Sequence, residues 1–276
     1  MDATWVVPEA EVALDVGAVL EATSLAAAAA ASLLRKAGDL DAPVPGLTWT
    51  IDGLGRHLAM ACAGFAASAE DRFGGLDADG TAALLARIAE VETDGTPAGL
   101  AAAVEAAAAA FVSAAARPPG DWLPTPWYRP DKENHLATMA CLVLGELTVH
   151  GEDLAGAVDQ PWSTDAEVAR LVVTGVFPAK LPVIADAEAA AGVRATYELV
   201  VDGGPSFSLR LDGEGVTIGP AGATAVDCHV GADPVTMLLY AYGRRPAEEL
   251  FAAGLLRSWG PDPSLGPRLK GYLRNP

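Results

Sequence analysis

Residues 142–154 read LVLGELTVHGEDL and place Glu146 and His150 four positions apart in a long apolar run. In a helix, with about 100° between successive residues, this spacing puts both side chains on one face and one turn apart. The surrounding leucines and valines predict a helix that is apolar almost all round, where an unpaired carboxylate would be costly. The pair can hold a divalent cation if a third ligand comes from elsewhere in the chain.

The third ligand must come from a small supply, because the chain has only four histidines, at positions 57, 135, 150 and 229. Apolar patterns ended by glycine or proline predict four long helices and one short helix: 9–37, 50–72, 79–91, 97–116 and 133–158. Four long helices with moderate connections favour an antiparallel bundle, whose interior is a usual place for a metal site. His57, near the start of its helix, would then face the pair.

The second half of the chain has a different pattern. Residues 194–201 and 206–211 alternate apolar and polar side chains and are separated by Asp-Gly-Gly-Pro, which is typical of a β-hairpin. Further strands are expected at 213–218 and 225–230, and helices at 233–242 and 246–253. We therefore predict a helical domain in residues 1–163 and a smaller α+β domain in residues 164–276.

Composition excludes several classes of partner. The chain has 36 acidic and 18 basic residues, and a net charge of −18 disfavours nucleic acid and anionic lipid. No segment is predicted to span a membrane, and no secretion signal is evident, so a cytoplasmic location is expected. The three cysteines are far apart and favour buried apolar positions over a disulfide framework or a zinc ribbon.

Two histidines and one carboxylate would leave metal positions open for water or substrate, unlike a closed structural zinc site. Zinc is the leading candidate, although nickel, iron and manganese accept the same ligands. The alternative is that Glu146 and His150 form a solvated surface pair and that His57 is a core histidine bonded to the backbone.

Two segments also resemble a known family. Residues 49–59, WTIDGLGRHLA, are similar to the W-T-v-x-d-L-x-x-H-L-a element of mycothiol-dependent maleylpyruvate isomerase-like proteins, and residues 146–155, ELTVHGEDLA, to their E-x-x-v-H-x-w-D-L-a element. The resemblance implies a DinB-type four-helix bundle, followed by a sterol-carrier-type C-terminal domain.

The resemblance also implies function. The matching residues His57, Glu146 and His150 would bind a divalent metal, usually zinc, and the thiol cosubstrate would be mycothiol. The metal would lower the pKa of the thiol and present a thiolate to an electrophile. In the isomerase reaction the thiolate adds to a cis double bond, the new single bond rotates, and elimination gives the trans product. An S-transferase would stop after addition or displacement.

The family pattern has a tryptophan between the second histidine and the aspartate, where this chain has Gly151-Glu152, so the pocket wall is expected to differ. Asp153 is retained, and it either orients a ligand histidine or is a polar residue near the helix end. The family also uses an arginine of the C-terminal domain to hold an anionic substrate. Arg244 is the best candidate for this role here, and a surface arginine is the alternative.

Two residues are candidates for contact with the thiol. His135 lies three turns before Glu146 on nearly the same face, so it would either meet a ligand at the bundle mouth or cap its helix. Trp127, in a proline-rich loop, would either line the thiol pocket or pack on the bundle.

The leading hypothesis is therefore a metal-dependent enzyme that uses mycothiol against a small electrophile, as an isomerase or S-transferase, in a monomer or homodimer. One alternative is a non-catalytic carrier or regulatory protein whose C-terminal domain binds an apolar ligand. Another is a metal-dependent hydrolase, since the same ligands activate water.

Overall fold

The protein is described by a computed structural model that covers residues 4–5, 14–126, 133–213, 215–222 and 225–274. The chain forms two compact units, Leu14–Thr164 and Asp165–Pro276, and residues 4–5 group with the second unit. The N-terminal strand β1 (Thr4–Trp5) pairs in parallel with a strand of the second unit.

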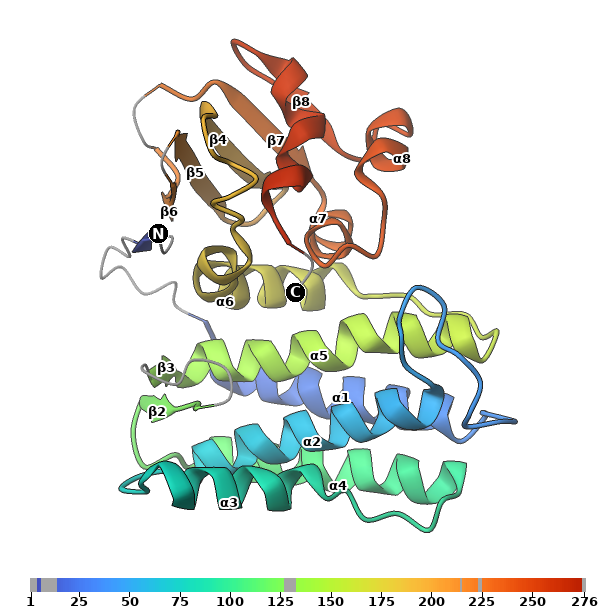
Figure 1. Ribbon diagram of the computed structural model, residues 1–276. Coiled ribbons are helices and arrows are strands. Elements are labelled where there is room, and N and C mark those ends of the chain that lie inside the picture. Colours follow the sequence, from blue (N-terminus) through green and yellow to red (C-terminus); the bar gives the residue numbers. More distant parts are fainter. Residues whose placement is uncertain (1–3, 6–13, 127–132, 214, 223–224, 275–276) are drawn as a thin grey trace. The chain divides into compact units, whose positions relative to one another are not determined.

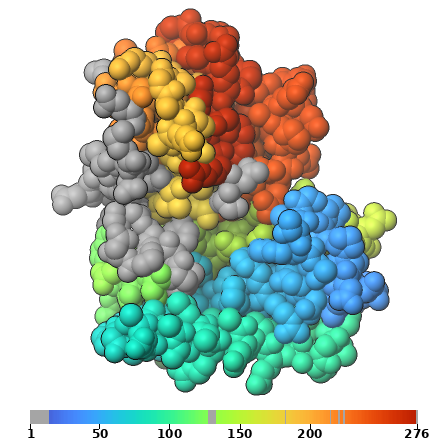
Figure 2. All heavy atoms as spheres, in the orientation of Figure 1, coloured from blue at the N-terminus to red at the C-terminus, as the bar shows by residue number. Residues whose placement is uncertain are grey.

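The first unit is a four-helix bundle with one additional helix (Figure 1). Its helices are α1 (Val16–Leu34), α2 (Ile51–Ala69), α3 (Ala78–Ala89), α4 (Pro97–Ala115) and α5 (Leu136–Ala157). α1 and α2 each pack against both α4 and α5, and α3 packs beside α2. The space-filling view shows atoms of the bundle helices, blue to green, packed against one another (Figure 2).

The core of the bundle is made by leucine, alanine and phenylalanine side chains from all four helices. Leu54, Leu58, Leu100, Phe111 and Leu144 are completely buried. α2 and α4 approach closely at Gly55, where an added Cβ would lie 2.6 Å from Leu100. A glycine two residues before His57 therefore allows the helix that carries this histidine to pack tightly.

Helices α1 and α4 are long and apolar enough to cross a membrane by length and composition alone. This is weak evidence, because the core helix of a soluble protein passes the same test. Much of their apolar character comes from alanine, as the sequence Leu25-Ala-Ala-Ala-Ala-Ala-Ala31 in α1 illustrates.

A small two-stranded sheet lies between α4 and α5 in the chain. One strand falls in the segment before the helix predicted for 133–158, and the other takes the first three residues of that predicted helix. Strands β2 (Trp122–Pro124) and β3 (Glu133–His135) pair antiparallel. Asn134 donates a short hydrogen bond to Thr125, and the backbone of Leu136 bonds to Asp121. Three-residue strands are too short to give a clear alternating pattern, which explains why the sequence did not predict them.

The second unit has a six-stranded sheet in the order β1-β6-β5-β4-β7-β8. Its strands after β1 are β4 (Arg194–Val201), β5 (Ser206–Asp212), β6 (Val216–Pro220), β7 (Cys228–Ala232) and β8 (Arg257–Trp259). β4 pairs antiparallel with β5 and parallel with β7, and the predicted β4–β5 hairpin is confirmed. Gly203, in its turn, has a positive φ of 68°, which glycine adopts readily.

The remaining helices of this unit are α6 (Ala166–Ile184), α7 (Pro234–Ala241), α8 (Ala247–Ala252) and the 3-10 helix η1 (Pro263–Tyr272). α7 and α8 were predicted, whereas α6 was not. The α6 sequence contains Pro178 and Pro182, which normally disfavour a helix interior, but its buried Val172, Val176 and Leu181 give it a packed face. The predicted fold, a four-helix bundle followed by an α+β domain, is confirmed.

Candidate metal centre

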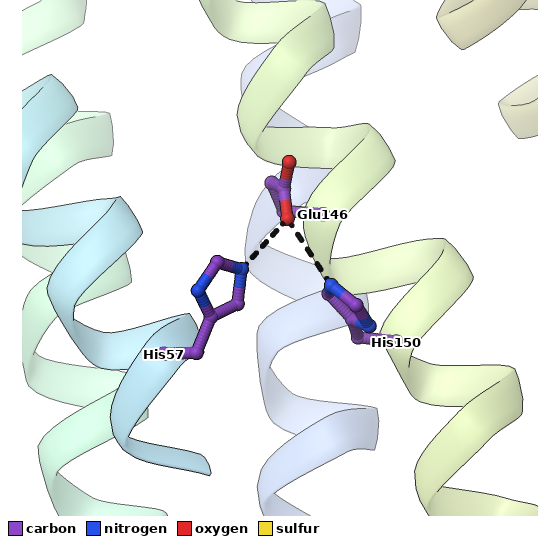
Figure 3. A group of neighbouring side chains, drawn as sticks. All are labelled: His57, Glu146 and His150. Carbon is purple, nitrogen blue, oxygen red and sulfur yellow. Dashed lines mark hydrogen bonds and ion pairs between the residues drawn. The ribbon is translucent and has the colours of Figure 1, made fainter. Parts of the chain in front are cut away.

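Three side chains from two helices meet inside the bundle: His57 of α2, and Glu146 and His150 of α5 (Figure 3). We call this group the His–Glu–His cluster. Each residue offers one ligand atom, and the three atoms all lie within 4.8 Å of one another. Among the described residues, these are the three side chains of metal-binding type that lie close enough together to hold one metal ion.

Local capping places the histidine of α2. The Thr50 hydroxyl accepts a hydrogen bond from the backbone N–H of Gly53 at 3.2 Å, so Thr50 caps the N-terminus of α2. His57 consequently lies in the second turn of the helix. On α5, the spacing of four residues directs Glu146 and His150 to the same face, as predicted, and both point toward His57 in Figure 3.

The cluster is centred on one carboxylate oxygen. Oε2 of Glu146 lies 3.1 Å from Nε2 of His57 and 3.3 Å from Nε2 of His150. Around a tetrahedral ion with metal–ligand bonds of 2.0–2.1 Å, neighbouring donor atoms are roughly 3.3 Å apart. The two observed separations agree with that value, so these residues fit a divalent metal. The side chains remain 26% exposed at His57 and 21% at Glu146, which leaves one side of the cluster accessible.

Hydrogen bonding controls the charge of the cluster. Burial alone raises the pKa of Glu146, but hydrogen bonds from His150 and His57 outweigh it and hold that pKa well below its usual range. Burial lowers the pKa of His150, and the hydrogen bonds to Asp153 and Glu146 raise it above its usual value. Glu146 is therefore a carboxylate at neutral pH, which is the form that binds a metal.

Asp153 lies behind His150. Its Oδ2 is 2.8 Å from Nδ1 of His150, and its side chain is only 6% exposed. With Nδ1 donating to Asp153, the opposite nitrogen, Nε2, faces Glu146 and is left to bind a ligand. This is the geometry expected of an orienting residue, which was one of the two roles considered for Asp153.

Of the other predicted site residues, the structure places His135 at the start of α5. His135 caps α5, because its Nδ1 accepts from the N–H of Ala137 at 3.3 Å. Eleven residues of helix, a distance of about 16 Å, separate it from Glu146. Arg244 follows α7 in the second unit and donates to the carbonyl of Tyr242 at 2.8 Å. Its part in substrate binding stays a prediction, and Trp127 lies outside the described residues.

Trp49 is a neighbour of the cluster that sequence reasoning did not assign to the site. Its ring centroid lies 4.7 Å from that of His57 and 5.8 Å from that of His150. Its position just before the helix cap is a usual place for an apolar side chain that packs against the first turn, and the sequence signal for a role at the site was its place at the start of the family element of residues 49–59. Cys62 is fully buried, and burial together with Glu146 raises its pKa to about 12.

Comparison with known proteins places the bundle in a family. Residues 20–155 match the family model described as "Mycothiol maleylpyruvate isomerase N-terminal domain". The helical domain of this chain belongs to this family. The matched residues include all three members of the His–Glu–His cluster. The family resemblance inferred from residues 49–59 and 146–155 is thus confirmed.

Solved structures support the same fold. The crystal structure of the mycothiol-dependent maleylpyruvate isomerase matches with a TM-score of 0.53 and 14% identity, over 89% of this chain and 93% of that chain. A histidine-to-alanine mutant of that enzyme matches with the same TM-score and coverage at 13% identity. At such low identity the likeness shows the fold alone. A search of curated proteins gives no match.

Proposed function

We propose that this protein is a metal-dependent enzyme that activates a low-molecular-weight thiol, mycothiol, for attack on an electrophilic small molecule. The reaction is an isomerisation or an S-transfer. The observation that carries the proposal is the convergence of His57, Glu146 and His150 in a domain of the mycothiol maleylpyruvate isomerase family. We propose zinc as the metal, because a set of two imidazoles and one carboxylate is typical of open zinc sites.

A divalent metal bound here would lower the pKa of a thiol and stabilise the thiolate. The protein side chains prepare the site for this. Glu146 supplies a negative charge at neutral pH, and Asp153 accepts the Nδ1 proton of His150, so that Nε2 is available as a ligand. The partial exposure of His57 and Glu146 supports access for a thiol and an electrophile.

As an isomerase, the enzyme would add the thiol sulfur to one carbon of a cis double bond. Rotation about the resulting single bond and elimination of the same sulfur would release the trans product and regenerate the thiol. As an S-transferase, it would retain the new carbon–sulfur bond in the product. We propose Arg244 as the group that holds an anionic substrate, and His135 and Trp127 as contacts of the thiol, in a cytoplasmic monomer or homodimer.

Calorimetric titration of the zinc-loaded protein with mycothiol, glutathione and ergothioneine tests the thiol assignment. We expect binding of mycothiol alone, and we expect it to disappear when a chelator removes the metal or when His150 is replaced by alanine. Binding of none of the three thiols would contradict the proposal. Co-purified lipid in such a preparation would instead favour the alternative of a carrier that binds an apolar ligand.

A further inference from the structure

The backbone of Trp49 and of the two residues after it is fixed by hydrogen bonds to the preceding loop. The carbonyl of Trp49 accepts from the N–H of Val44 at 2.9 Å, and the next residue, Thr50, forms a β-bridge with Pro43. One residue further, the N–H of Ile51 donates to Ala42 at 3.0 Å. Trp49 therefore has a defined position at the start of α2, even though its side chain is 38% exposed.

The indole of Trp49 packs beside both imidazoles of the cluster. The ring planes are tilted by 41° to His57 and by 44° to His150, and His57 is the nearer of the two. The two imidazoles meet each other edge to face, with their centroids 5.1 Å apart. The three rings thus form one packed group beside Glu146.

The two histidines differ in how their second nitrogen is held. Nδ1 of His150 is bonded to Asp153, which fixes the orientation of that ring. Among the described residues, Nδ1 of His57 has no hydrogen-bond partner. The bond from Nε2 of His57 to Glu146 requires a proton on Nε2, and this proton is absent when Nε2 is a metal ligand.

We propose that Trp49 is the positioning residue of His57. Its indole fixes the imidazole orientation by ring packing, in the role that Asp153 fills for His150 by a hydrogen bond. An imidazole that is already oriented loses little rotamer freedom when it binds a metal, so the affinity is higher. This inference rests on the proposed function, because it takes the His–Glu–His cluster to be a metal site.

Zinc affinity, measured by competition with a chromophoric chelator, tests the proposal in Trp49→Ala, Trp49→Phe and wild-type protein. We expect about a 10–100-fold loss in the alanine variant, the range observed when an orienting partner of a metal ligand is removed. The phenylalanine variant keeps an aromatic ring and should recover most of the affinity. Trp122→Ala is the matched control, because Trp122 is an exposed tryptophan of the same unit that packs on His135, outside the cluster.

A second measurement separates positioning from a general loss of packing. The chain has only four histidines, so the imidazole nitrogen signals of the zinc-loaded protein can be assigned by NMR. In Trp49→Ala, the His57 signals should broaden or shift more than those of His150, whose ring is also held by Asp153. If the alanine variant does not fold, Trp49→Leu keeps an apolar side chain at the start of α2 and takes its place.

The proposal is overturned if Trp49→Ala binds zinc as tightly as the wild type, or if the NMR signals of His57 and His150 change to the same extent in this variant. Failure of the wild type itself to bind zinc would contradict the proposed function instead, so the two failures can be told apart.

Discussion

Gly151 follows His150 directly on α5, and its lack of a side chain has a structural reason. A Cβ at this position would lie 2.3 and 2.4 Å from two ring atoms of Trp162. Carbon atoms in favourable contact are about 3.5–4.0 Å apart, so Gly151→Ala would create an overlap of more than 1 Å. The indole cannot swing away without cost, because it is rigid and its Nε1 donates to Thr164 at 3.2 Å.

Two opposing contributions determine how Gly151→Ala changes the free energy of unfolding. Alanine is more favourable than glycine in a helix interior by about 0.8–1.0 kcal/mol. Overpacking of this kind costs about 1–3 kcal/mol. Gly156 is the matched control, because it lies on the same helix and a Cβ added there would have no neighbour within 4 Å. We expect Gly151→Ala to be about 1–3 kcal/mol less stable than Gly156→Ala.

Urea unfolding followed by the helical circular dichroism signal measures these differences. In a Trp162→Ala background the overlap is gone, so Gly151→Ala should then stabilise the bundle by about 0.8–1.0 kcal/mol, as expected from helix propensity alone. The reasoning is refuted if Gly151→Ala stabilises the wild-type protein as much as Gly156→Ala does.

Three other predictions concern the cluster and its surroundings. Asp153→Asn, which keeps the shape of the side chain but removes its charge, should lower zinc affinity about 10–100-fold in a chelator competition, and an unchanged affinity would argue against an orienting role. The pKa of His150 in the folded metal-free protein is raised above its ordinary value of 6.5, so its contribution to stability is fully present below pH 6.5 and is lost as the pH rises through the folded-state value. The melting temperature of the metal-free wild type, compared with His150→Ala, should therefore show an advantage near pH 6 that shrinks toward pH 9, and a constant difference would contradict this. Burial raises the pKa of Cys62 and of Cys141 to about 12. Neither thiol should therefore react with a thiol reagent at pH 8 until urea unfolds the bundle. Rapid labelling of either cysteine in the native protein would disprove their burial.

The helices of the bundle were predictable because their apolar and capping patterns are local. Thr50 and the alanine-rich segments identify α2, α1 and α4 without any tertiary information. Helix α6 was missed because Pro178 and Pro182 are strong local signals against a helix, and its stability comes from burial that only the folded sheet provides. The parallel pairing of β1 with β6 joins residues more than 200 positions apart, and no local pattern encodes such a contact.

The site was predictable to a similar extent. The four-residue spacing of Glu146 and His150 determines their common face, and the shortage of histidines made His57 a natural third member. The proximity of Trp49 to the imidazoles depends on the loop that precedes α2, whose path is fixed by backbone hydrogen bonds rather than by a side-chain pattern. The helix-capping role of His135, by contrast, was among the roles that its sequence position allowed.

The central claim is that the His–Glu–His cluster binds a metal, and the metal content of the purified protein tests it most directly. Elemental analysis by mass spectrometry of undialysed protein at neutral pH should give about one divalent ion per chain for the wild type. His150→Ala should lose the ion, whereas His135→Ala, which changes a histidine outside the cluster, should keep it. A wild-type protein without bound metal, or a His150→Ala variant that retains the ion in full, would contradict the account.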